Sequence, residues 1–95
     1  MPTQLNGRTC DMDAINKIAT KNKLFLVEDS AQALGSKYKE RFAGTFGIAS
    51  CISFFPAKVL GCFGDAGAIL CQDPDIFEKC YQIHDHGRNK NGDVI

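Results

Sequence analysis

Apolar positions recur with helical spacing in two stretches, one near each end of the chain. The first predicted helix runs from about Asp11 to Asn22, and its apolar side consists of Met12, Ile15, Ile18 and Ala19. Asp11 is suited to cap the free amide groups of the first turn. The second helix is predicted between Asp73, a suitable N-cap followed by Pro74, and Gly87, a common residue type just past a helix end.

Between the helices, short apolar runs without helical spacing predict strands. One run covers 24–28, and two others cover 48–54 and 66–71. Continuous apolar runs of this length are typical of strands that are buried on both faces, as in a parallel sheet. The pattern therefore predicts an α/β fold with a mostly parallel sheet and flanking helices.

A predicted hairpin and two acidic residues lie next to the first predicted strand. The alternating, charged stretch 36–44 suits an exposed hairpin with Lys39 and Glu40 near its bend. Glu28 and Asp29 close the run 24–28, where the carboxyl ends of parallel strands collect ligands. We interpret Glu28 as a solvated loop acid and keep Asp29 as a candidate site residue.

Composition narrows the class of protein. The chain has 95 residues, room for at most one small domain, and its 11 basic and 11 acidic side chains cancel. A neutral chain gives no electrostatic argument for nucleic acid or an anionic membrane as partner, and no apolar run approaches membrane-spanning length. Five cysteines, an odd number without a CxxC pair, indicate free thiols in a reducing compartment, so we expect the cytoplasm.

The predicted sheet is too large for so short a chain. A buried parallel strand needs neighbours on both edges and layers on both faces. Two helices barely supply these layers, so we expect residues 1–95 to be an incomplete part of a larger domain.

One lysine stands out in this pattern. Lys58 follows the apolar run at 48–54 and precedes a glycine-rich turn. Apolar surroundings disfavour the ammonium form, and a neutral amine is a nucleophile toward aldehydes, as a Schiff-base lysine must be. An ordinary lysine whose stem lies on the surface and whose head reaches water explains the same residue without any chemistry.

Two other site types are weaker. Gly61, Gly64 and Gly67 are spaced unlike the nucleotide-binding patterns and lead into a predicted strand, whereas a phosphate loop needs a helix N-terminus. The possible metal ligands Cys80, His84 and His86 do not share one helix face, and no second ligand cluster exists, so we predict no metal site.

A third combination points to pyridoxal phosphate. Asp29, Ser53 and Lys58 each lie at or just beyond the carboxyl end of a predicted strand, so a sheet could bring them together. A Schiff-base lysine, an acid for a protonated ring nitrogen and a hydroxyl for a phosphate are what a protein supplies to this cofactor. Spacing alone makes the combination suggestive.

At these residues the sequence resembles a known family. The segments are Val27–Gln32, Gly44-x-x-Gly47, Ser53–Lys58 continuing through Leu60-Gly61-x-x-Gly64-Asp65-x-Gly67-Ala68, and His86-Gly87-Arg88. In this order they resemble the DegT/DnrJ/EryC1/StrS family of pyridoxal-phosphate-dependent aminotransferases, which act on nucleotide-linked keto-sugars. The resemblance implies the type I aminotransferase fold, a homodimer with active sites at its interface, and an amino donor such as glutamate or glutamine.

The resemblance also implies individual roles. Lys58 would be the Schiff-base lysine and would shuttle a proton, and Asp29 would pair with the pyridine nitrogen. Gln32 would lie near the cofactor ring, and Ser53 would bind the cofactor phosphate. Dehydratases of the family carry histidine in place of this lysine, so Lys58 favours transamination.

The departure from the family is length. Family enzymes are several times longer, and residues 1–95 match only the second part of the large domain, without the small domain. We therefore expect a fragment of a sugar aminotransferase that is inactive by itself. A non-catalytic truncated remnant and a small stand-alone α/β binding module are the alternatives.

Overall fold

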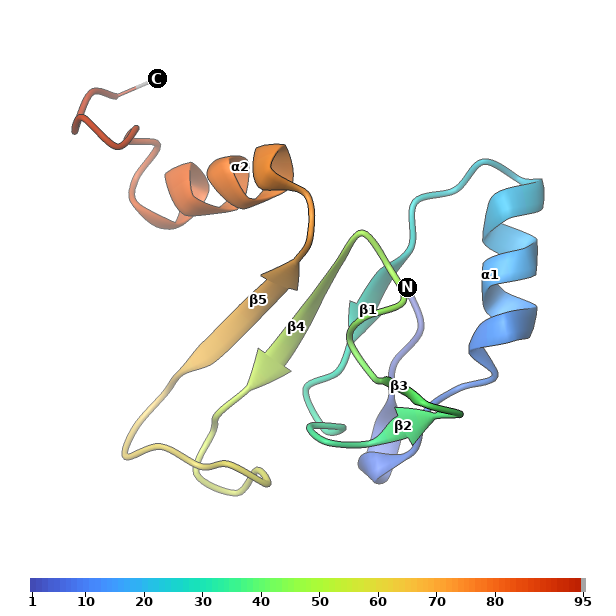
Figure 1. Ribbon diagram of the computed structural model, residues 1–95. Coiled ribbons are helices and arrows are strands. Elements are labelled where there is room, and N and C mark those ends of the chain that lie inside the picture. Colours follow the sequence, from blue (N-terminus) through green and yellow to red (C-terminus); the bar gives the residue numbers. More distant parts are fainter. Residues whose placement is uncertain (95) are drawn as a thin grey trace.

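The computed structural model describes residues 1–94, which form two α-helices, five strands and one 3₁₀ turn (Figure 1). In chain order these are η1 Leu5–Gly7, α1 Met12–Lys21, β1 Val27–Asp29, β2 Lys37–Tyr38, β3 Arg41–Phe42, β4 Ala49–Ser53, β5 Gly67–Cys71 and α2 Pro74–His84. The α/β class predicted from the sequence is confirmed, and none of the helices of residues 1–94 has the length and apolar character that crossing a membrane requires.

The larger sheet has the strand order β1-β4-β5 and is mixed. β1 and β4 are parallel, with Val27 opposite Ala49 and Asp29 opposite Cys51. β4 and β5 are antiparallel, because the loop 54–66 returns the chain at the same end of the sheet rather than crossing to the other end. The expected parallel character therefore holds for β1 and β4, and β5 adds an antiparallel neighbour.

Both predicted helices form where the capping residues place them. The Asp11 carboxylate accepts a hydrogen bond from the Ala14 amide at the start of α1, and Asp73 caps α2 in the same way. Gly87 follows α2 with φ at 75°, and its amide donates to the Gln82 carbonyl. Figure 1 shows α1 on the β1 side of the sheet and α2 beside β5.

The predicted hairpin is confirmed and is attached to α1. β2 and β3 pair in antiparallel register around a bend in which Lys39 has φ at 54°. The Tyr38 hydroxyl donates to the Asp11 carboxylate over 2.8 Å, and Lys39 forms an ion pair with Asp13. These contacts tie the hairpin to the first turn of α1.

The first strand is shorter than predicted. Leu24 and Phe25 are 61% and 85% exposed, and β1 begins only at Val27. The Leu24 amide still donates to the Ala19 carbonyl, so the chain remains bound to the end of α1 at this point. Strand pairing starts only where β4 offers a partner.

The described residues do not close around a full core. The accessible surface is 6944 Å², whereas scaling with the mass of 10.4 kDa gives about 5,400 Å². The radius of gyration is 14.8 Å, against about 12.4 Å for a compact chain of this length. Five apolar side chains are buried, namely Met12, Leu26, Ala33, Ala43 and Ile52. A large apolar surface is thus left without a cover within residues 1–94.

The contacts of Asp11 make a pH-dependent prediction. The Ala14 amide and then the Tyr38 hydroxyl lower the pKa of Asp11 below its ordinary value of 3.8. The contribution of the ionised Asp11 to stability is therefore complete well above pH 3.8 and is lost as the pH falls through the lowered pKa. We expect Asp11→Ala to lower the unfolding temperature at neutral pH, and the difference from the unsubstituted protein to shrink below pH 3.8.

Thermal unfolding followed by circular dichroism across this pH range measures the effect. Asp65→Ala is the control, because Asp65 is exposed and accepts no hydrogen bond among the described residues. A difference between Asp11→Ala and the unsubstituted protein that stays constant with pH would contradict the assignment.

Candidate active site

Asp29 is the last residue of β1, and both its amide and its carbonyl form hydrogen bonds with the N-terminal segment. Its amide donates to the Pro2 carbonyl and its carbonyl accepts from the Gln4 amide, at 2.9 and 2.8 Å. Its half-buried carboxylate accepts through Oδ1 from the Ala31 amide at 3.1 Å, and Cys51 Sγ lies 3.7 Å from the same oxygen. Among the described residues nothing donates to Oδ2, so one oxygen remains available to a ligand.

Ser53 lies on the same face of the sheet as Asp29. Asp29 and Cys51 are register partners in the parallel pair, and Ser53 is two residues beyond Cys51 on β4. Because side chains alternate along a strand, Cys51 and Ser53 share the face toward which the Asp29 carboxylate points. Ser53 Oγ accepts from the Phe55 amide at 3.2 Å and can still donate its own hydrogen.

Lys58 lies in a closed loop that follows β4. The Cys62 amide donates to the Phe54 carbonyl at 2.8 Å, and the Lys58 amide donates to the Phe55 carbonyl at 2.8 Å. Gly61 passes so close to this turn that a Cβ added to it would lie 2.4 Å from the Pro56 carbonyl oxygen. The loop thus has a fixed base, and Lys58 is half-buried within it.

Of the four predicted site residues, the structure brings Asp29 and Ser53 to one face of the sheet. Asp29 and Ser53 end neighbouring parallel strands, and Lys58 follows in the loop after β4. Gln32 is exposed, and its Oε1 accepts from the Asn6 amide at 3.1 Å in the N-terminal turn. Among residues 1–94 no hydrogen bond or ion pair joins the side chains of these four residues, so their individual roles remain predictions.

The interpretation of Glu28 as a solvated loop acid is wrong. Its side chain is fully buried, and its carboxylate accepts four hydrogen bonds. The donors are the Gly44, Phe46 and Gly47 amides and Gln4 Nε2, at distances of 2.8, 2.6, 2.9 and 3.1 Å. Strand alternation could have revealed this position, because Glu28 is two residues beyond Leu26 and so shares its buried face.

The turn that binds Glu28 needs glycine at both ends. A Cβ on Gly47 would lie 2.3 Å from the Leu26 carbonyl oxygen, a distance that backbone packing does not permit. Gly44 has φ at 88°, and a Cβ there would lie 2.9 Å from Ser50 Oγ. The spacing Gly44-x-x-Gly47 therefore brings the turn close enough for its amides to reach the Glu28 carboxylate.

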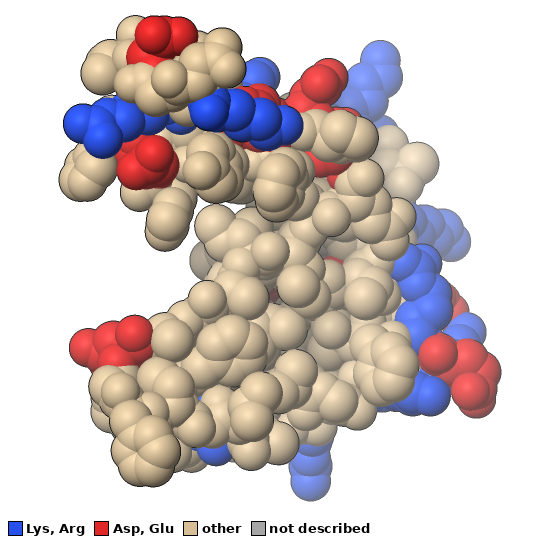
Figure 2. Space-filling model, turned by 60° about the vertical axis from the view of Figure 1, so that its left-hand side comes forward, with Lys and Arg blue, Asp and Glu red and all other residues tan. Residues whose placement is uncertain are grey.

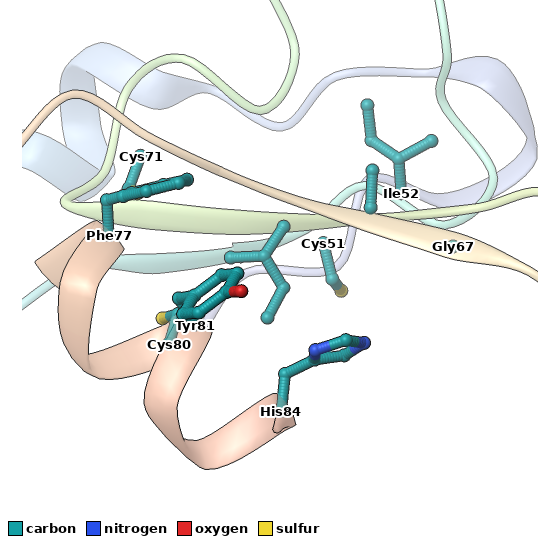
Figure 3. Close-up of a pocket in the computed structure, with 10 residues that line it drawn as sticks. Cys51, Ile52, Gly67, Cys71, Phe77, Cys80, Tyr81 and His84 are labelled. Atoms are coloured by element: carbon teal, nitrogen blue, oxygen red, sulfur yellow. The ribbon is translucent and has the colours of Figure 1, made fainter. Parts of the chain in front are cut away.

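An open groove of about 450 Å³ separates the sheet from α2. Figure 3 shows Cys51 pointing from β4 toward α2 and Ile52 pointing to the opposite side, while Tyr81 and His84 point from α2 toward the sheet. In Figure 2 the recess lies below α2, and its visible walls are mainly uncharged. Cys51 links this groove to Asp29, since its thiol contacts the Asp29 carboxylate.

The structure also shows where the residues of the two weaker site types lie, the metal site and the phosphate loop. Cys80 and His84 line the groove, and within residues 1–94 no three His, Cys, Asp or Glu side chains form a group that could hold a metal ion. The stretch from Gly61 leads into β5, a strand rather than a helix, as the sequence predicted.

Comparison with known proteins decides the family. The sequence model of the DegT/DnrJ/EryC1/StrS aminotransferase family matches residues 1–94. The chain belongs to this family. The resemblance inferred from the sequence is thereby confirmed, and the match extends over all but the last residue.

Individual relatives of this family member are several times longer. It is 45% identical over 87 residues to a pleiotropic regulatory protein of Geobacillus stearothermophilus, covering 92% of this chain and 23% of that one. It is 41% identical over 90 residues to the UDP-2-acetamido-2-deoxy-3-oxo-D-glucuronate aminotransferase of Pseudomonas aeruginosa, covering 95% of this chain and 25% of the relative. The chain thus spans about a quarter of the length of these relatives.

Solved structures agree on the fold. A DegT DnrJ EryC1 StrS aminotransferase from Brucella abortus superposes with a TM-score of 0.93 and 35% identity over 99% of this chain and 26% of its own. NtdA from Bacillus subtilis, solved with bound cofactor PMP, superposes with a TM-score of 0.85 and 34% identity over 99% of this chain and 21% of its own. The predicted fold, part of an aminotransferase α/β domain, is confirmed by these structures.

The close approach of Gly61 to Pro56 predicts how the lysine loop responds to substitution. Gly61→Ala would push Cβ against the Pro56 carbonyl and open the base of the loop. We expect hydrogen exchange of the Cys62 amide to accelerate about tenfold or more, which corresponds to about 1.4 kcal/mol. Gly64→Ala is the control, because Gly64 has φ at 117° but open space around it. Equal acceleration in both variants would attribute the effect to backbone strain instead of the contact.

Ser30 makes a separate prediction about stability. Its hydroxyl is buried and has no hydrogen-bond partner among the described residues. We expect Ser30→Ala to raise the free energy of unfolding by about 1 kcal/mol. On folding, the Ser30 hydroxyl loses its hydrogen bonds to water without gaining a partner, and alanine removes this cost. The control is Ser50→Ala, which removes a buried hydroxyl that donates to the Gly44 carbonyl and should lower the free energy of unfolding by about 1 kcal/mol. Denaturant titration measures both, and a loss of stability in Ser30→Ala would refute the prediction.

Proposed function

We propose that this chain is the lysine-bearing part of a pyridoxal-phosphate-dependent aminotransferase that acts on a nucleotide-linked keto-sugar. The observation that carries the proposal is that Asp29 and Ser53 end neighbouring parallel strands on one face, followed at once by the Lys58 loop. Family membership and the names of relatives such as the Pseudomonas aeruginosa aminotransferase support the substrate class. Glutamate or glutamine is the proposed amino donor.

The residues present fit the cofactor. Oδ2 of Asp29 receives no hydrogen bond within residues 1–94, and Ser53 Oγ has a hydrogen to donate. Asp29 would hold a proton at the ring nitrogen, and Ser53 would donate to the phosphate. Bound pyridoxal phosphate supplies an aldehyde that condenses with amines and a protonated ring that withdraws electrons.

Lys58 and Gln32 complete the proposed set. The Nζ atom of Lys58 would hold the cofactor between reactions and carry the proton that is moved during amino transfer. Gln32 uses its side-chain oxygen for the Asn6 amide, which leaves its NH₂ group to donate toward the ring.

We further propose that residues 1–95 form an incomplete domain whose activity requires the remaining length that its relatives have. The excess accessible surface and the coverage of about a quarter of each relative support this. A homodimer and a cytoplasmic location are part of the same proposal. The second candidate, a non-catalytic remnant, rests on the same exposed surface, because a segment with so small a core holds a cofactor poorly.

Substitution of Lys58 tests the function in the protein expressed from its complete reading frame. After incubation with pyridoxal phosphate and reduction with borohydride, we expect mass spectrometry to find the cofactor attached to Lys58. Lys58→Ala should abolish both this attachment and amino transfer to nucleotide-linked keto-sugars, because no other amine occupies its position. Lys79→Ala, a change of the same kind at an exposed residue of α2, should leave both unchanged.

Attachment of the cofactor to another lysine, or full transfer activity in Lys58→Ala, would refute the proposal. The same assay on residues 1–95 alone separates the two candidates. Tight cofactor binding and turnover by this segment would exclude a non-catalytic remnant.

A further inference from the structure

The Glu28 carboxylate is stabilised by hydrogen bonds and does not form an ion pair within residues 1–94. The two ion pairs of residues 1–94 are Lys39–Asp13 and Lys90–Glu78, so Glu28 takes part in neither. Each of its oxygens accepts two hydrogen bonds, Oε1 from the Phe46 and Gly47 amides and Oε2 from the Gly44 amide and Gln4 Nε2. A buried carboxylate is tolerated only where such a complete set of donors exists.

This anchor acts on a short strand. β1 has three residues, and Leu24 and Phe25, which precede it in the chain, are exposed. A slip of one residue in the register of a strand exchanges its two faces. In β1 such a slip would move Asp29 from the open face to the buried one.

Glu28 and Asp29 are adjacent and therefore point to opposite faces of the sheet. The Glu28 side chain enters the turn 44–47, while the Asp29 side chain lies beside Cys51 on the face that leads to the groove. Fixing one carboxylate thus fixes the direction of the other. The backbone bonds of Asp29 to Pro2 and Gln4 hold its position along the strand.

We propose that Glu28 is a positioning residue for Asp29: through the turn 44–47 it sets the register and rotation of β1 that present the Asp29 carboxylate to the cofactor ring. The inference rests on the proposed function, in which Asp29 holds a proton at the ring nitrogen. Glu28 itself touches neither substrate nor cofactor in this scheme, because its side chain is buried on the opposite face.

Glu28→Gln tests this with almost no change in shape. Glutamine offers one acceptor oxygen, and its NH₂ group would face backbone amides that are themselves donors. We expect the side chain at position 28 to lose two of its four hydrogen bonds and β1 to rotate or slip, which moves Asp29 away from the ring nitrogen.

The readout is ¹⁵N NMR of the complete protein loaded with ring-labelled pyridoxal phosphate, which reports whether the ring nitrogen is protonated. We expect the protonated signal to be lost in Asp29→Asn, reduced in Glu28→Gln and unchanged in Glu40→Gln, an exposed acid at the hairpin bend. A purely structural role for Glu28 would lower the yield of loaded protein but leave the nitrogen protonated in the molecules that remain.

The outcomes separate the two proposals. An unchanged signal in Glu28→Gln together with a lost signal in Asp29→Asn overturns the positioning role alone. An unchanged signal in Asp29→Asn overturns the role of Asp29, and with it the inference. If Glu28→Gln does not accumulate, Glu28→Asp replaces it, since its shorter carboxylate must draw β1 toward the turn; a fully protonated signal in that variant also overturns the inference.

Discussion

The fold depends on a single buried carboxylate. Removing a charge from water costs several kcal/mol unless hydrogen bonds replace the lost solvation. For Glu28 this replacement comes from three amides of the turn 44–47 and from Gln4. Because these donors come from two segments and Glu28 comes from a third, the N-terminal stretch, β1 and the turn that precedes β4 are held around one side chain.

This arrangement explains the two glycines of the turn. The turn must approach the backbone before β1 closely, and Gly47 leaves no space for a side chain against the Leu26 carbonyl. Gly44 adopts a positive φ beside Ser50. The two glycines therefore serve the contact between the turn and the Glu28 carboxylate. Asp29 and Ser53 lie on the opposite face of the sheet.

The groove beside α2 is open, and much of the apolar surface of the described residues is uncovered. The recess under α2 and the exposed faces of β5 belong to the C-terminal half, and Leu24 and Phe25 add exposed apolar surface before β1. Relatives and solved structures that share this fold are about four times longer. In our proposal the remaining length of such a protein covers these surfaces and completes the substrate site around Lys58.

The sequence by itself determined the local elements, because caps, periodicity and turn residues act over a few positions. Asp11, Asp73 and Gly87 marked the helix ends, and apolar runs marked β4 and β5. Ordered short segments around Lys58 also identified the family. Only the tertiary structure decided the hydrogen-bond partners of the buried Glu28, the antiparallel pairing of β5 and the exposure of Leu24 and Phe25. Glu28 depends on the backbone amides at 44–47 and β5 depends on its pairing with β4, and a run of residue types does not show where such partners will lie.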